Sequence, residues 1–332
     1  MNVNDDTKED YPCDSKIVRA VSATADPAGP YTIADTLFPR SSWEPALARA
    51  PNGSLVVMFF GNISNPPAVG SPACLTPSGS YNLTTTTTHI AVSASGSVAG
   101  PWSDPVVVRG MENTPRGRVG PCVWHCASSN PSPAFHPNGS LYAAMRQNPC
   151  WKGFSTREHV GLWRADSSWT GSWTLVSPNP LYGWGTGSER NCSDDGCPSH
   201  EDPHLWFDDR GRGFHLLTHD QNHPATHSVR GAYGYSLDGH DWTLLTTPAA
   251  SNASAWPPSI MWSNGSSTLL ARRQRPSFIR DPDSNRITHL ISGADFNHHV
   301  GASKPFCDGC HWGTGITLIQ PLKSRPSQWK HR

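Results

Sequence analysis

The sequence predicts an all-β protein, folded as a five-bladed β-propeller whose blades are four-stranded antiparallel sheets. Three observations lead to this prediction. The composition is rich in turn-forming and aromatic residues, with 29 Gly, 31 Pro and 14 Trp among 332 residues. A proline-led pair of strand-like segments recurs four times with constant internal spacing. Further strand-like segments follow at least three of these pairs, which gives the four strands that a propeller blade needs.

The composition favours strands over helices and excludes two classes of partner. Long helices need Ala, Leu, Glu and Lys, whereas only 16% of this chain is charged and Gly and Pro are abundant. The formal net charge is zero, so the chain has no basic excess with which to release counterions from a nucleic acid. No segment approaches the roughly 20 apolar residues that cross a bilayer. We therefore expect neither a nucleic acid nor a membrane as a partner.

The first two strands of each blade are predicted from the repeated unit. In each copy a polar residue and a proline open a strand, a turn follows, and a second strand runs back. The prolines are Pro45, Pro131, Pro203 and Pro276, and the residues eight positions later are Gly53, Gly139, Gly211 and Ser284. The prolines lie 86, 72 and 73 residues apart, so the chain has room for between four and five blades. This constant spacing argues against a β-sandwich or two smaller β domains, which have no reason to repeat.

The outer strands and the closure of the ring complete the predicted fold. A third strand is expected from His89, His159 and Arg230, and a fourth around Trp102, Trp173 and Trp242. Residues 31–332 are expected to form a single propeller domain, and residues 1–30 a partly irregular N-terminal extension. The tail from His311 is expected to pair with Tyr31–Leu37 and close a fifth blade, which hides sheet edges that an open array would expose.

Cysteines and glycosylation sequons predict an exported protein braced by disulfides. The cysteines are Cys13, Cys74, Cys122, Cys126, Cys150, Cys192, Cys197, Cys307 and Cys310. Asn-x-Ser/Thr sequons stand at Asn52, Asn62, Asn82, Asn138, Asn191, Asn252 and Asn264. Sequons in this number, together with nine cysteines, point to the secretory path and an extracellular glycoprotein. The odd cysteine count leaves one thiol free or paired with another chain.

Four short segments refine this expectation. Cys307 and Cys310 are followed by His311, but no second pair lies at zinc-finger spacing, so a local disulfide is favoured over a zinc site. The acidic and polar residues 1–10 do not resemble a signal peptide, so an exported form would have lost its leader. Asn52 and Asn138 lie in turns at the far end of the innermost strands, where glycans would leave the central funnel free.

The residue before each repeated proline is predicted to face the centre of the propeller. The innermost strand of each blade lines the central channel, and these residues open the innermost strands: Glu44, Asn130, Asp202 and Arg275. A residue before proline is expected to be extended. Such residues can also satisfy backbone groups at a crowded propeller mouth. We favour a functional site, because two carboxylates across a cleft are the minimal machinery of glycoside hydrolysis.

Several motifs resemble five-bladed glycoside hydrolases of families 43, 62 and 117. The motifs are the Glu-Pro and Asp-Pro strand openings, the Pro-Asn-Gly-Ser turns, and the segments 91–102 and 236–242. In family 43 the resemblance implies a general base at the position of Glu44 and a pKa-tuning aspartate at Asp202. The family's general acid is a glutamate two places before the fourth proline, where this chain has Gln274.

An amide at that position cannot donate a proton as a carboxylic acid does. Three explanations compete: Glu201 supplies the proton, the chain carries an inactivating change, or the protein binds sugar on a hydrolase scaffold without cleaving it. The sequence alone does not separate them.

The remaining candidates are residues that would hold the substrate. Trp43 precedes Glu44 and is expected to stack on a sugar face or to join the core, and histidines cluster around the third blade. The predicted substrate-binding residues are Trp43, Asn130, Arg146, His200, His204, His219, Gln274 and Arg275. We expect no metal among the site residues and no required cofactor, although carboxylate and carbonyl oxygens leave a structural calcium possible.

The sequence thus predicts a secreted, monomeric glycoside hydrolase that acts on a polysaccharide or oligosaccharide, with Glu44, Asp202 and Glu201 as catalytic residues. A non-catalytic carbohydrate-binding propeller is the first alternative, and Gln274 is its best support. A polysaccharide lyase is the second, because histidines and Arg275 are present to take a proton. A sialidase is disfavoured, because the aspartate-box-like segment 236–242 is one residue short and no arginine triad is evident.

Overall fold

The structure of the chain is a computed structural model that describes more than half of its residues. The described residues are 2–3, 15–24, 26–27, 29–39, 41–63, 87–111, 129–147, 159–177, 200–208, 212–220, 231–246, 254–257, 259–270, 272–281, 284, 286–295 and 316–322. All nine cysteines lie outside these ranges, so the predicted disulfides, including the one between Cys307 and Cys310, stay predictions. In the ranges described, no helix has the length and apolarity needed to cross a membrane.

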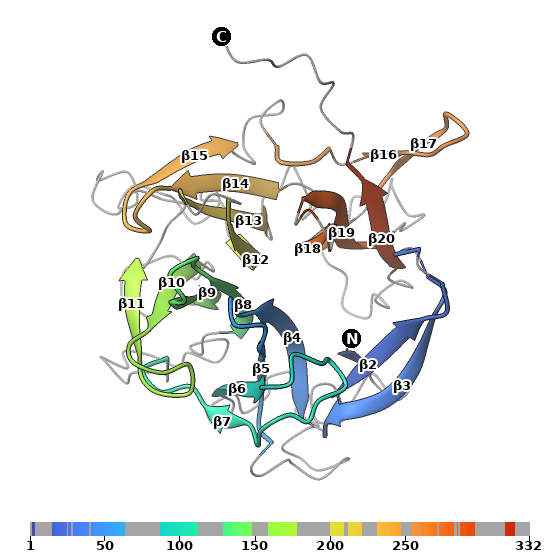
Figure 1. Ribbon diagram of the computed structural model, residues 1–332. Coiled ribbons are helices and arrows are strands. Elements are labelled where there is room, and N and C mark those ends of the chain that lie inside the picture. The colour runs from blue at the N-terminus through green and yellow to red at the C-terminus, as the bar shows by residue number, and fades with distance from the viewer. Residues whose placement is uncertain are drawn as a thin grey trace, which may run out of the picture.

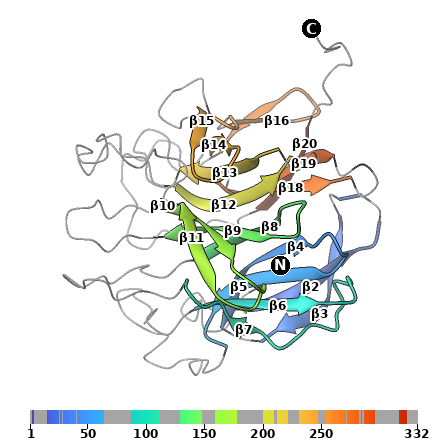
Figure 2. The same cartoon turned by 60° about the vertical axis from the view of Figure 1, so that its left-hand side comes forward.

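The protein is all-β, as predicted, and its antiparallel sheets are arranged as a β-propeller. Every element in the described ranges is a strand. Figure 1 shows the sheets placed around a common centre, with the first strand of each proline-led sheet nearest to it. In Figure 2, which turns this view by 60°, the inner strands of neighbouring sheets run beside one another.

Three sheets have the predicted blade pattern of four strands in sequence order. The first contains β4 (Ser42–Arg49), β5 (Leu55–Gly61), β6 (Thr87–Ser93) and β7 (Val106–Val107). The second contains β8 (Ser129–Phe135), β9 (Leu141–Gln147), β10 (His159–Ala165) and β11 (Trp173–Ser177). The third contains β12 (His200–Phe207), β13 (Phe214–Asp220), β14 (Gly231–Ser236) and β15 (Trp242–Thr246). The strand pattern predicted from the repeat is therefore confirmed in these sheets, except that the fourth strand expected around Trp102 lies at Val106–Val107 instead.

Two three-stranded sheets and a hairpin make up the rest of the described fold. One sheet contains β1 (Asn2–Val3), β2 (Lys16–Ser22) and β3 (Tyr31–Phe38). The other contains β18 (Arg272–Arg280), β19 (Ile287–Asp295) and β20 (Ile316–Pro321). The hairpin contains β16 (Ser259–Met261) and β17 (Ser267–Leu269).

The predicted pairing of the C-terminal tail with Tyr31–Leu37 is wrong. β20 pairs with β19, with Ile319 opposite Ile291, and β3 pairs with β2 instead. The reason is that β2 already provides a partner for β3, and Ile17 and Val18 of β2 are buried. β1 and β2 belong to the segment 1–30, so part of the predicted extension is regular strand. The domain boundary at residue 30 stays a prediction.

The hydrophobic core lies between the sheets. One cluster joins the first and second four-stranded sheets, and a second cluster joins the second and third. All seven residues of β5 are buried. Fully burying one large apolar side chain contributes about 1.5–3 kcal/mol, so these inter-sheet clusters hold the inner strands, and the residues that open them, in fixed positions.

Candidate functional site

The four residues that precede the repeated prolines share an unusual backbone conformation. Glu44, Asn130, Asp202 and Arg275 have φ angles of 55°, 50°, 49° and 53°. These angles lie in the left-handed region, so the expectation of an extended conformation at these positions is wrong. A non-glycine residue there is strained by about 1–3 kcal/mol, and such strain persists only where the surroundings impose it.

A β-bulge at each of these positions explains the conformation. The pairing register with the second strand shifts between Trp43 and Ala46, Ser129 and Ser132, Glu201 and His204, and Gln274 and Ser277. The skipped residues are the left-handed residue and its proline in every case. Because proline has no N–H, the ladder loses no donor there, and a bulge redirects the side chain of the residue before it.

The four bulged residues converge and bind one another across the sheets. The backbone N–H of Asn130 donates to Oε2 of Glu44 at 2.9 Å, and its side-chain amide donates to Oδ1 of Asp202. The backbone N–H of Arg275 donates to Oδ2 of Asp202 at 3.2 Å. The Arg275 guanidinium lies 3.4 Å from Oε1 of Glu44 and 3.9 Å from Oδ1 of Asp202.

These contacts fit both roles considered for the residues before proline: satisfying backbone groups at the propeller mouth and forming a functional site. Glu44 and Asp202 each accept a hydrogen bond from a backbone N–H of the following proline-led sheet. They therefore link neighbouring sheets at the centre. The two carboxylates also lie together beside the half-exposed guanidinium of Arg275, while only 8% and 5% of their own side-chain surfaces are exposed.

A second group of polar side chains lies directly behind the first. Arg146 forms an ion pair with Glu201, and its Nε donates to Oγ of Ser129 at 2.8 Å. Ser129 in turn donates to Oδ1 of Asn130 at 2.9 Å. Arg146 of β9, a predicted site residue, is thereby connected through Ser129 to the central ring, the name used here for Glu44, Asn130, Asp202 and Arg275. Ser129 itself was not predicted from the sequence, and its only sequence signal is its place immediately before Asn130 on the same strand.

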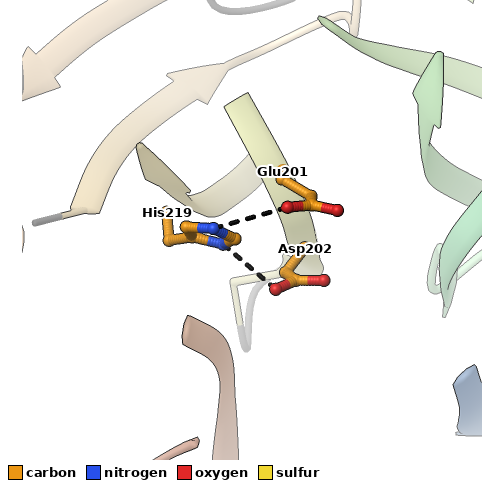
Figure 3. A group of neighbouring side chains, drawn as sticks. All are labelled: Glu201, Asp202 and His219. Atoms are coloured by element: carbon orange, nitrogen blue, oxygen red, sulfur yellow. Dashed lines mark ion pairs between the residues drawn. The ribbon is translucent and has the colours of Figure 1, made fainter. Parts of the chain in front are cut away.

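His219 of β13 is fully buried and lies between two carboxylates. Its Nδ1 is 3.0 Å from Oδ2 of Asp202, and its Nε2 is 3.5 Å from Oε2 of Glu201 (Figure 3). Burial alone would raise the pKa of Asp202, but the positive charges of Arg275, His219 and Arg146 and a hydrogen bond with His219 lower it well below its ordinary value. Asp202 is therefore a permanent carboxylate at neutral pH.

Glu201, Asp202 and His219 also form the one group in the described residues whose ligand atoms lie close enough to hold a metal ion. Their ligand atoms lie within 4.8 Å of one another. Calcium prefers six to eight oxygen ligands, whereas this set offers an imidazole nitrogen and a carboxylate already paired with Arg146. The set does not fit calcium, and a structural calcium elsewhere stays a prediction.

Three predicted substrate-binding residues lie apart from the central ring. Trp43 is buried and packs edge-on against Phe60, with ring centroids 5.3 Å apart, which favours its core role over sugar stacking. His200 is buried, and its Nδ1 lies 2.8 Å from Oγ1 of Thr218. His204 stacks on Trp206 at 5.8 Å and packs edge-on against Phe278 at 5.2 Å. Burial, and then the charge of Arg280, lower the pKa of His204 to about 4.

Gln274, the last predicted contact residue, is half-buried on β18 directly before Arg275. It occupies the same place in its bulge as Glu201 in β12 and Trp43 in β4. The third and fourth proline-led strands therefore present a carboxylate and an amide at equivalent positions.

Comparison with known proteins identifies the fold. No family model matches the sequence, and a search of curated proteins found no match. A thermostable family-43 glycoside hydrolase is 11% identical with a TM-score of 0.51, and the match covers 90% of this chain and 80% of the other. An α-L-arabinofuranosidase from Lactobacillus brevis is 11% identical with a TM-score of 0.50, covering 89% of this chain and 79% of the other.

A xylan β-1,4-xylosidase from Bacillus halodurans C-125 is 15% identical with a TM-score of 0.49, covering 93% of this chain. This chain spans 52% of that enzyme's length. The predicted resemblance to propeller glycoside hydrolases is confirmed at the level of the fold.

Proposed function

We propose that this protein is a glycoside hydrolase that cleaves glycosidic bonds of a polysaccharide or oligosaccharide. The observation that carries the proposal is that Glu44 and Asp202, which come from non-adjacent sheets, lie close together. They belong to a group of four bulged residues with a strained backbone. In this proposal Glu44 activates the attacking water. Asp202, held ionised by its cationic neighbours, orients the substrate and stabilises positive charge that develops on the sugar.

The source of the proton for the leaving group follows from counting charges. Three carboxyl groups, those of Glu44, Asp202 and Glu201, face two guanidinium groups, those of Arg146 and Arg275. A buried net charge is costly, so one additional proton in this cluster balances it. We propose that Glu201, whose Oε2 lies 3.5 Å from Nε2 of His219, delivers the proton to the leaving oxygen.

The test is a hydrolysis screen of the full chain against a panel of polysaccharides and aryl glycosides, read by reducing ends and by ultraviolet absorbance. The variants are Glu44→Gln, Asp202→Asn and Glu201→Gln, with Asp208→Asn as the control. Asp208 forms an ion pair with Arg212, whose side chain is 65% exposed, outside the site. We expect each site variant to lose about 100-fold or more in kcat and the control to retain activity. Full activity in Glu44→Gln and Asp202→Asn would contradict the proposal.

A second candidate is a carbohydrate-binding propeller without catalysis. Gln274 at the position of the family's acid and the backbone hydrogen bonds accepted by Glu44 and Asp202 both favour it. Sugar affinity without turnover at any pH, with turnover appearing in Gln274→Glu, supports this candidate. An ultraviolet-absorbing product from the native chain supports a lyase instead.

We also propose that the sheet of β1, β2 and β3 is the fifth blade. β2 contacts β4, and Figure 1 shows this sheet between the β4 sheet and β20. We also propose that the protein is exported and braced by disulfide bonds, on the basis of the sequons and cysteines of the sequence, and that it acts as a monomer.

A further inference from the structure

Three Asn-Gly-Ser segments adopt one and the same turn. They occupy residues 50–54, 136–140 and 262–266. In each turn the backbone N–H of the first residue donates to the carbonyl of the fifth, at 2.8, 2.9 and 2.8 Å respectively. The glycine N–H donates to the first carbonyl at 2.9, 2.8 and 3.0 Å. The asparagine Oδ1 accepts from the serine N–H at 3.0, 3.0 and 2.9 Å.

In this geometry each asparagine side chain is fixed at its carbonyl oxygen and exposed to solvent. Its carbonyl oxygen is held by the serine, and the side-chain amide nitrogen carries no hydrogen bond that the structure records in these turns. The glycines Gly53, Gly139 and Gly265 have φ angles of 88°, 90° and 81°, and no atom lies within 4 Å of a Cβ built on any of them. All three asparagines are exposed, so the space beside each acceptor is open.

The turn of the β16–β17 hairpin differs from the other two in its first residue. That residue is Trp262, with 39% of its surface exposed, and its indole N–H donates to Oγ1 of Thr268 at 2.8 Å. The corresponding residues are Ala50, which is buried, and His136, whose ring packs edge-on against Phe207 at 5.0 Å. The hairpin alone among these three turns offers an exposed aromatic ring, fixed by a hydrogen bond, two residues from its acceptor.

We propose that Asn264 is an N-glycosylation site whose first sugar stacks on the indole of Trp262. The polarised C–H groups of a pyranose face carry partial positive charge, and they complement the negative face of an aromatic ring. The inference rests on the export proposed above and is otherwise independent of the carboxylate site. The hairpin lies at the periphery of the propeller in Figure 1, so the glycan does not cover the central strands.

The modification is a group transfer with a defined co-reactant, a lipid-pyrophosphate-linked oligosaccharide. The amide nitrogen of Asn264 attacks C1 of the first sugar and forms an N–C bond. The C1–O bond to the pyrophosphate breaks, and the lipid pyrophosphate leaves with the bonding electron pair. The amide nitrogen loses one proton to a base of the transferase. No oxidation or reduction takes place.

One other described sequon provides an internal contrast. Asn62 is 9% exposed, and its backbone N–H donates to the carbonyl of Ser41 at 2.9 Å. It lies beyond the end of β5 and not in one of the three turns. We expect Asn62 to remain unmodified in the folded protein.

The first experiment measures site occupancy. The full chain is directed into the secretory path of eukaryotic cells by a secretion leader, which makes the result independent of whether the natural chain is exported. Glycopeptides from secreted and cell-associated protein are analysed by mass spectrometry after glycan release in heavy-oxygen water. We expect Asn264 to be modified and Asn62 not. An unmodified Asn264 in both fractions overturns the proposal, while loss of hydrolase activity would bear only on the proposed function.

The second experiment tests the stack itself. The glycan is trimmed to its first sugar or removed completely, and the temperature of unfolding is compared for the native chain, Trp262→Ala and Trp262→Phe. We expect the first sugar to raise the midpoint temperature of unfolding by about 1–3 °C in the native chain and in Trp262→Phe. The phenylalanine variant keeps an aromatic ring but lacks the indole N–H. Trp262→Ala should lose this shift, and Asn264→Gln is the control without the acceptor. An equal shift in Trp262→Ala overturns the stacking.

Discussion

At the scale of single residues, the site depends on side chains held in a conformation that they do not prefer. Four left-handed residues before proline are stabilised by contacts with one another, not by their own backbone energies. Asn130 is central to this arrangement, because its backbone N–H binds Glu44 and its side chain binds Asp202. Substitutions of Asn130 can therefore separate the cost of its left-handed backbone from the contribution of its side-chain contacts.

Asn130→Ala and Asn130→Gly make this separation. Both variants remove the amide that binds Asp202 and should reduce the free energy of unfolding by about 1–3 kcal/mol. Alanine is additionally strained at a φ of 50°, whereas glycine is not, so Asn130→Gly should be the more stable of the two by about 1 kcal/mol. Chemical denaturation measures the difference. Equal stabilities would show that the left-handed backbone is not maintained in solution.

The pH dependence of stability should report the partly buried imidazole of His204. Its pKa is lowered to about 4, against about 6.5 in an unfolded chain, so the unfolded state binds the proton first as the pH falls. Stability is therefore unaffected above pH 6.5 and falls as the pH drops from about 6.5 to about 4, by up to about 3 kcal/mol. In His204→Gln this part of the pH dependence should disappear. An unchanged slope between these pH values would contradict the burial of a neutral His204.

At the scale of elements, local patterns predicted the strands better than their partners. The proline-led pairs β4–β5, β8–β9 and β12–β13 follow from the repeat, and β11 and β15 begin at the predicted tryptophans. β7 is only Val106–Val107, because Pro101 and Pro105 withhold backbone donors from the rest of that segment. The choice of β2 as partner of β3 depends on burial of Ile17 and Val18 against distant strands, which no local pattern encodes.

In the candidate site, too, the sequence predicted which residues matter better than how the strands pair around them. The sequence identified Glu44, Asn130, Asp202 and Arg275 from their position before proline, and the structure brings them together. The rule that a residue before proline is extended predicted the wrong backbone conformation at these four positions. The left-handed conformation comes from a bulge, which depends on the pairing of two strands and not on one dipeptide. Ser129 was missed for that reason, since its contact with Arg146 crosses from β8 to β9.

Strand β14 gives a test of how closely the sheets pack on their covering loops. A Cβ added to Gly231 would overlap the ring of Trp256, so Gly231→Ala should destabilise the protein by about 1–3 kcal/mol. Gly293 on β19 is the matched control, because the nearest atom to its added Cβ is 3.7 Å away and its φ is not positive. Thermal unfolding compares the two variants. A Gly231→Ala protein as stable as Gly293→Ala would mean that Trp256 does not pack there.

At the scale of the whole molecule, the centre of the propeller is where the sheets are joined by charge as well as by apolar contacts. Arg146 of β9 pairs with Glu201 of β12, and both side chains are largely buried. Glu201 in turn lies next to His219, which contacts Asp202. The network that we assign to catalysis therefore also links the second and third four-stranded sheets, and the two roles predict different responses to mutation.

Breaking this pair tests whether the central charges hold the ring together. Arg146→Met leaves Glu201 as a buried carboxylate without its cation, and should lower the free energy of unfolding by about 3–5 kcal/mol. The double variant Arg146→Met with Glu201→Gln removes both charges and should recover much of this loss, because a neutral amide needs no counter-charge. Denaturant unfolding, followed by tryptophan fluorescence, measures both variants against Glu201→Gln alone. If the double variant is no more stable than Arg146→Met, the destabilisation comes from lost packing of the arginine side chain, and the centre is held by shape instead of charge.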